Sequence, residues 1–148
     1  MTRRWSGYNN AGICATAMLA VLAHAERMAV SKALLVMPLV MHDATVRYLG
    51  SGSVSFREVA SLVAHRPDLF ANFNSRFEES VAVSVNAIQW IVAAGYASFD
   101  GTLVLRRPPK IDASFGKRVQ RIAKASGHIA AILAAPVEEL YLNFRVQL

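Results

Sequence analysis

The chain has 148 residues, of which 54% are hydrophobic and 18% are charged, and its formal net charge is +6. This length suits a single domain with a sizeable buried core, and the high apolar content excludes an intrinsically disordered chain. The one cysteine, Cys14, excludes an internal disulfide and a cysteine-based metal cluster, and it favours a reducing, cytoplasmic setting.

Residues 1–49 are predicted to form apolar helices at the centre of the fold. The segment from Asn9 to about Met28 is rich in Ala, Met and Leu, which are strong helix formers, and Asn9 or Asn10 can cap its start. Because this segment is apolar nearly all round, we expect it to be buried. No stretch reaches the about 18 uninterrupted apolar residues of a membrane span, so no membrane association is expected.

A second apolar segment covers residues 33–48 and contains Pro38. Proline removes a backbone donor and clashes with the preceding helical turn. Either a helix kinks at Pro38, or a short extended piece at 34–37 leads into a helix that starts there. The Gly and Ser residues at 50–53 predict a break in the regular structure.

Residues 55–107 follow the order of a winged-helix unit, and Ser55 with Glu58 matches a capping box at its start. The predicted elements are a helix from Ser55 to about Arg66, helices Leu69–Phe77 and Glu78–Ala94, a helix-ending Gly95, and strands Tyr96–Phe99 and Thr102–Arg106 joined by Asp100-Gly101. The fold class is therefore predicted as mainly α, with a winged-helix-like centre and one β-hairpin.

The third helix of this unit bears on function. DNA-binding winged helices place it in the major groove, where its cationic and amide side chains contact base edges. Here no Lys or Arg lies between Arg76 and Arg106, so the helix cannot neutralise phosphates. This favours a protein–protein module, with a winged-helix DNA-binding transcription regulator as the alternative. Trp90, on the same helix, is expected to belong to the core.

Residues 113–148 are predicted to be helical again and to complete the single domain. The predicted elements are a helix over Ala113–Ser126 ended by Gly127, a second helix from about His128, and a final helix with Pro136 in its first turn.

All of the net positive charge lies between Arg106 and Lys124, where seven bases accompany one acid. At 100° per residue, Lys117, Arg121 and Lys124 share one face of the predicted helix, with Arg118 beside them. The opposite face carries Phe115, Val119 and Ile122. Two interpretations stay open: a solvated face of an amphipathic helix, or a docking surface for an acidic protein or a nucleic-acid backbone. The candidate contact residues are Arg106, Arg107, Lys117, Arg118, Arg121 and Lys124, with Arg47 and Arg145 as lesser candidates.

Catalytic motifs are almost absent from the sequence. It contains no Gly-rich phosphate loop, no nucleophile elbow and no pair of histidines at metal-ligand spacing. His42-Asp43 is similar to the metal-binding pair of phosphohydrolases, but the further ligands of that chemistry are not visible, so a pair on a helix surface is favoured over a hydrolase. We therefore expect no enzyme activity, no metal site and no cofactor.

Several segments, which together extend over nearly the full length of the chain, occur in an order that is typical of a known family. They are Trp5 with the apolar helix led by Asn10, the stretch Leu34–His42, Thr45–Leu49, the helix around Arg76–Gly95 with its hairpin, and Asn143–Val146. In this order they resemble the middle component of the bacterial three-component ABC-type systems, in which an ABC-type ATPase, a small middle protein and a variable third component are encoded together.

The resemblance implies a non-enzymatic adaptor that couples an ABC-type ATPase to an effector in a bacterial anti-phage or conflict complex. The expected partners are these two subunits, while weak non-specific nucleic-acid contact and homo-oligomer formation stay open.

Overall fold

Helices make up most of the computed structural model, which describes residues 2–51 and 58–147 and, among these, the side chains of 12–51, 58–112 and 114–147. The prediction of a mainly α fold with one hairpin is confirmed. The helices are α1 (Thr2–Ala25), α2 (Val30–Ala33), α3 (Val36–Val40), α4 (Asp43–Leu49), α5 (Val59–His65), α6 (Phe73–Ala93), α7 (Lys117–Leu133) and α8 (Val137–Asn143), with 3-10 turns η1 (Pro67–Phe70) and η2 (Ala113–Phe115). The strands are β1 (Arg27–Ala29), β2 (Ala97–Phe99) and β3 (Thr102–Leu105).

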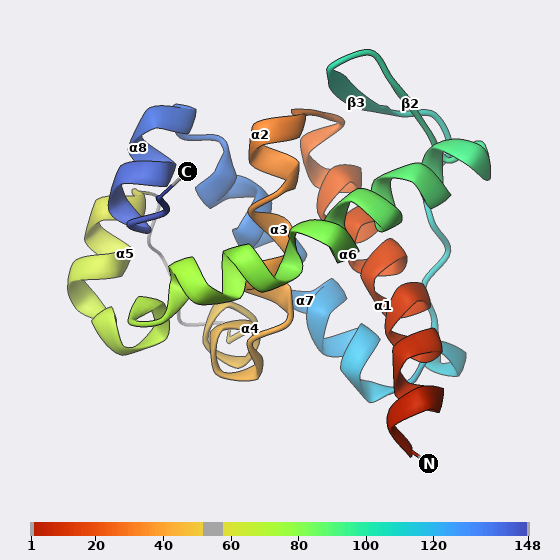
Figure 1. Cartoon of the computed structure of the whole chain (residues 1–148), viewed down its shortest axis with the longest axis horizontal. Helices are drawn as coiled ribbons and strands as arrows, with labels where there is room; N and C mark the ends of the chain where they lie inside the picture. The colour runs from red at the N-terminus through yellow and green to blue at the C-terminus, as the bar shows by residue number, and fades with distance from the viewer. Residues whose placement is uncertain (1, 52–57, 148) are drawn as a thin grey trace.

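α1 is the central helix, and α6 and α7 both pack along it (Figure 1). Its described part buries small and flexible side chains such as Cys14, Ala17 and Met18, so the prediction of a central apolar helix is confirmed. The predicted bounds are wrong at both ends, because the helix begins at Thr2 and ends at Ala25. Glu26 ends it in a left-handed conformation with a φ of 67°, which turns the chain into β1.

The second apolar segment contains two short helices, α2 and α3, rather than either predicted arrangement. The chain turns at Leu34 and Leu35, and Pro38 lies within the first turn of α3, where its missing N–H costs no helical hydrogen bond. All five residues of α3 are buried. Gly50 ends α4 as the predicted break requires, whereas positions 52 and 53 lie outside the described residues.

The centre of the chain differs from the predicted order of three helices before the hairpin. Glu58 is extended and precedes α5, so it cannot occupy the third helical position that a capping box requires, and Ser55 lies outside the described residues. The predicted break between Phe77 and Glu78 is wrong, since α6 runs through both. The order is therefore helix, 3-10 turn, long helix and hairpin.

The predicted hairpin is confirmed as β2 and β3, and Gly95 ends α6 with a φ of 84° as expected. A third strand was missed. β1 pairs antiparallel with β3, with Arg27 opposite Val104, so β3 is the middle strand of the sheet. β1 has only three residues and follows directly on a long helix, which leaves no alternating pattern for sequence reasoning to detect.

α7 is one continuous helix, so the predicted end at Gly127 is wrong. Gly127 lies where α7 passes α1, and a Cβ atom there would lie 3.5 Å from the His24 ring. The helix also begins later than Ala113, because η2 and then Gly116, with a φ of 95°, precede it. Pro136 directly precedes the final helix, α8.

Candidate functional site

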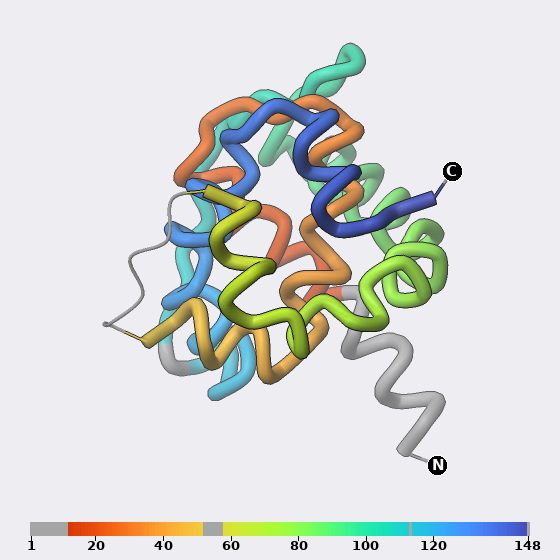
Figure 2. Tube along the Cα trace, turned by 90° about the vertical axis from the view of Figure 1, so that its left-hand side faces the viewer, coloured from red at the N-terminus to blue at the C-terminus, as the bar shows by residue number. Residues whose placement is uncertain are grey.

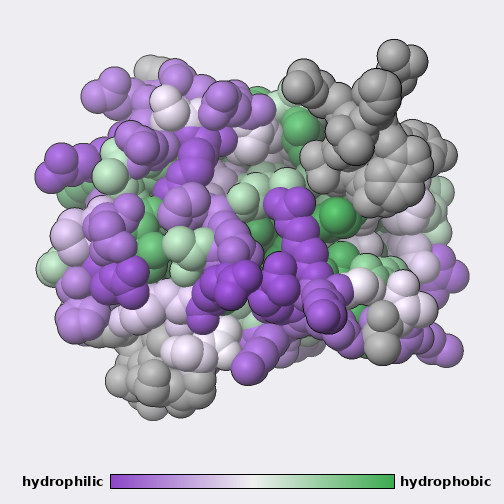
Figure 3. All heavy atoms as spheres, turned by 90° about the horizontal axis from the view of Figure 1, so that it is seen from below, coloured by the Kyte–Doolittle hydropathy of each residue, from purple (hydrophilic) through white to green (hydrophobic). Residues whose placement is uncertain are grey.

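A row of cations follows the outward side of the first two turns of α7. We call Lys117, Arg118, Arg121 and Lys124 the basic stripe. Val119 and Ile122 are buried on the inward side, as predicted, so the amphipathic pattern orients the stripe toward solvent. Phe115 does not share that inward side, since it belongs to η2 and is 45% exposed. Seen from the side of α4 and α7, hydrophilic side chains gather across the middle of this face (Figure 3).

α4 packs beside α7 and places one carboxylate against the stripe. Asp43 Oδ2 accepts a hydrogen bond from Arg47 Nε at 2.6 Å, and Asp43 Oδ1 lies 3.8 Å from Arg121 Nη2. The hydrogen bond from Arg47 is the main cause that lowers the pKa of the Asp43 carboxyl. Arg47 therefore joins the stripe through Asp43, which gives this face five cations to one carboxylate.

The cations of the basic stripe differ in their exposure to solvent and in their polar contacts. Lys117 and Lys124 are exposed and form no ion pair within the ranges that the structure describes. Arg118 is exposed and directs Nη2 toward the Met41 sulfur at 3.8 Å. Arg121 is half-buried, and its Nε has no hydrogen-bond partner among the residues that the structure describes. The two lysines are thus the cations most available to a partner.

Arg106 and Arg107 lie at the end of the hairpin, and their polar contacts are to the hairpin and α6. Arg106 Nε donates to Ser98 Oγ at 2.9 Å, and Arg107 Nη2 donates to the Ala94 carbonyl at 3.0 Å. The Arg107 guanidinium also lies over the Tyr96 ring, 4.2 Å from its centroid. These two arginines therefore mark a second basic position, next to the C-terminus of α6.

Arg145 lies in a third region. It is exposed, has a φ of 58° and follows α8, which packs on α5 at one end of the molecule (Figure 2). The structure thus brings Arg47 to the stripe and leaves Arg145 on a different set of helices.

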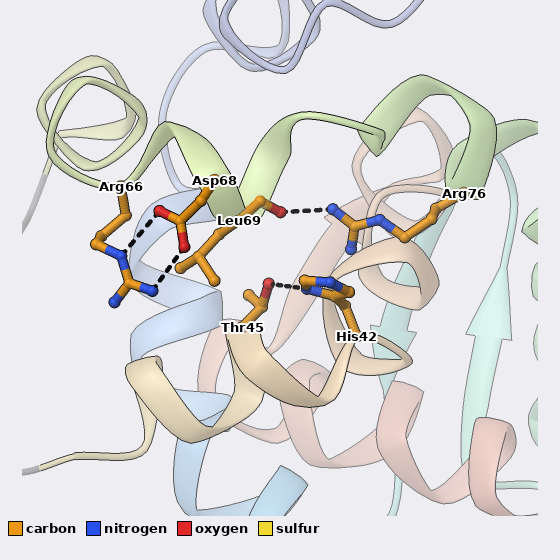
Figure 4. Close-up of polar contacts among 6 residues, drawn as sticks. All are labelled: His42, Thr45, Arg66, Asp68, Leu69 and Arg76. Carbon is orange, nitrogen blue, oxygen red and sulfur yellow. Dashed lines mark hydrogen bonds and ion pairs between the residues drawn. The ribbon is translucent and has the colours of Figure 1, made fainter.

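His42 and Asp43 direct their polar contacts to different neighbours. His42 Nδ1 is 2.7 Å from Thr45 Oγ1, and burial together with the nearby Arg76 lowers the pKa of the imidazole (Figure 4). Asp43 instead binds the two arginines described above. Within residues 2–51 and 58–147, no group of three or more His, Cys, Asp or Glu could hold a metal ion.

A polar hollow of about 400 Å³ opens beside His42 and is lined by residues of η1 and α6. Arg76 donates from Nη1 to the Pro38 carbonyl at 2.7 Å. It also donates from Nη2 to the Leu69 carbonyl at 2.6 Å (Figure 4). Arg66 binds Asp68 through two hydrogen bonds at the same hollow. Because Arg76 bonds backbone carbonyls of two other elements, it holds α3 and η1 against α6.

Trp90 was predicted to be core, and this prediction is wrong. Its side chain is 56% exposed and stacks on Tyr96, with ring centroids 6.3 Å apart. In the second half of α6 the buried residues of the inward face are Ser84, Ala87, Ile88 and Ile91. Trp90 lies about 100° from the centre of that face, so a helical projection of residues 84–91 could have placed it outside.

None of the described helices is long and apolar enough to span a membrane. Comparison with curated proteins and with solved structures gave no match. The chain does match a family model over residues 10–148, which covers nearly all of it. Membership of a multi-component system implies protein partners. The chain belongs to the family of ABC-three component (ABC-3C) system Middle Component 3.

Proposed function

We propose that this chain is a non-enzymatic adaptor that joins an ABC-type ATPase to an effector subunit in a bacterial anti-phage or conflict complex. The observation that carries the proposal is the basic stripe on α7. It presents a concentrated positive field on a rigid helix, and such a field attracts an acidic surface and orients it during association.

Two carboxylates, one beside the stripe and one just before α7 in the sequence, have polar partners within this chain. Asp43 is held by Arg47 and Arg121, and Asp112 accepts hydrogen bonds from Ser114 before α7 begins. Both groups have a lowered pKa, so both are ionised at neutral pH. The surface is therefore equipped for ionic contact.

The proposed partner surface is acidic and belongs to the ATPase or to the effector. Lys117 and Lys124 lie two helical turns apart on α7, about 10 Å along the axis. Side chains on such a line match a row of carboxylates on a partner helix or strand. Exposed contacts of this kind mainly raise the association rate and depend on salt.

Co-purification of the chain with both other components of its system tests the proposal. Lys117→Glu with Lys124→Glu should abolish complex formation, because two attractive contacts become repulsive. Arg121 is left unchanged, since a glutamate there would lie against Asp43 and disturb α4.

Arg27→Glu with Lys32→Glu makes the same change in net charge far from the stripe in the sequence and is the matched control. It should keep the complex intact, and circular dichroism should show unchanged helix content in both variants. If the variant with Lys117→Glu and Lys124→Glu still co-purified with both partners, the proposal would be refuted.

A further inference from the structure

The outward face of α6 is an uncharged surface. α6 crosses in front of α1 and α3 (Figure 1). No charged residue occurs between Glu79 and Asp100 in the sequence. Outward positions of the helix carry Ala82, Val83, Val85, Asn86, Gln89, Trp90 and Ala93, all of them exposed.

This composition is unusual for a surface in contact with water only. Val83, Val85 and Trp90 rank among the exposed large hydrophobic side chains of the chain. Centres of protein interfaces are depleted in charge, and Trp, Tyr and Arg dominate their binding energy. At the C-terminal end of α6, Trp90 lies against Tyr96, and Arg107 lies over the same ring.

The two ends of this face carry opposite charges. Glu78 and Glu79 lie at the N-terminal end and are exposed. Arg106 and Arg107 lie at the C-terminal end, where Arg107 is anchored to the Ala94 carbonyl. A surface that is acidic at one end, uncharged in the middle and basic at the other is complementary to itself when a second copy lies antiparallel to it.

We propose that the outward face of α6 docks onto the same face of a second copy of this chain, antiparallel and about a two-fold axis. This self-association is independent of the proposed function, because it does not use the basic stripe. A closed two-fold pair is the commonest arrangement of identical subunits.

The sequence of α6 suits an axis that passes near Asn86. Trp90 and Ala82 are each four residues from Asn86, so the Trp90 ring would lie over the small Ala82 of the second copy. Glu78 and Ala94 are each eight residues from it, so Glu78 would meet the Arg107 guanidinium. The axis therefore pairs large with small and negative with positive.

Sedimentation velocity of the full chain, from about 1 to about 200 µM, tests the proposal. The wild-type chain should form a reversible dimer. Trp90→Ala should weaken it at least about tenfold, because the exposed ring is the anchor of the interface. Leu142→Ala, which truncates a 77% exposed leucine on α8, is the matched control and should leave the dimer unchanged.

A charge exchange tests the antiparallel register. Glu78→Arg with Glu79→Arg, and separately Arg106→Glu with Arg107→Glu, should each give a monomer, because like charges would then meet across the axis. An equimolar mixture of the two variants should restore a dimer, since every end again meets its opposite charge.

Three results would overturn the proposal. One is a wild-type chain that stays monomeric over the whole range. Another is a dimer that resists both Trp90→Ala and the charge reversals. The last is a monomer whose binding to the ATPase component needs Trp90, which would assign the face to that protein. The variant with Lys117→Glu and Lys124→Glu should still dimerise, so failure of the adaptor proposal and failure of this one are distinguishable.

Discussion

α6 and α7 both pack along α1, yet their outward faces carry different kinds of side chain. Inside, they are alike, because Ile91 of α6 and Ile129 of α7 are both fully buried. Outside, α6 presents an uncharged face with Trp90, whereas α7 presents the basic stripe. Packing on α1 therefore constrains only one side of each helix and leaves the other side free to carry chemistry for a partner.

The sharpest test of this contrast compares the stability cost of substitutions on the inward and outward sides of the two helices. Ile91→Ala and Ile129→Ala should each lower the free energy of unfolding by about 2–5 kcal/mol, because each leaves a cavity in the core. Outward changes should cost much less, about 1.5 kcal/mol at most for Trp90→Ala and about 0.5 kcal/mol for Lys124→Ala. Urea unfolding measures all four, and equal costs inside and outside would refute the contrast.

The two outward faces should also differ toward nucleic acid. We expect weak binding of duplex DNA at low salt, and Lys117→Glu with Lys124→Glu should reduce it at least about tenfold, because phosphate contacts dominate such binding. Asn86→Ala with Gln89→Ala should leave it unchanged. Fluorescence anisotropy at two salt concentrations is the measurement. Tight, sequence-dependent binding that needs Asn86 and Gln89 would instead favour a transcription regulator.

Substitution of a glycine should have opposite effects within α7 and at the end of α6. Gly127→Ala should stabilise the chain by about 0.5–1 kcal/mol, because alanine favours the helix and the new Cβ makes an ordinary contact with the His24 ring. Gly95→Ala should destabilise it by about 1 kcal/mol, since the φ of 84° disfavours any side chain. Thermal unfolding gives both signs, and a shift in the same direction for both variants would contradict this assignment.

The smallest effect concerns the link between α4 and α7. The Arg47 hydrogen bond lowers the pKa of Asp43 below its ordinary value of 3.8 in the folded chain. Its contribution to stability is therefore present above pH 3.8 and is lost as the pH falls through the folded pKa. Asp43→Asn should be slightly less stable than wild type at about pH 7, and this difference should shrink as the pH falls below 3.8. A difference that persists in acid would rule out this ionic link.

Sequence reasoning succeeded where a local signal was strong. The Asp100-Gly101 turn between alternating residues predicted the hairpin, and the all-round apolar helix predicted the centre of the fold. It failed at Gly127, where α7 continues through a residue that disfavours a helix. It also failed between Phe77 and Glu78, where two separate helices were predicted but α6 is continuous. Packing along α1 stabilises those helices, and no local pattern records it.

The amino-acid sequence alone determined the mainly helical fold and the concentration of positive charge between Arg106 and Lys124. Tertiary structure alone decided that Arg47 meets the basic stripe through Asp43, that Arg107 lies at the end of α6, and that Trp90 faces solvent. The reason is physical: period and charge are properties of one segment, whereas neighbours and exposure depend on which segments pack together.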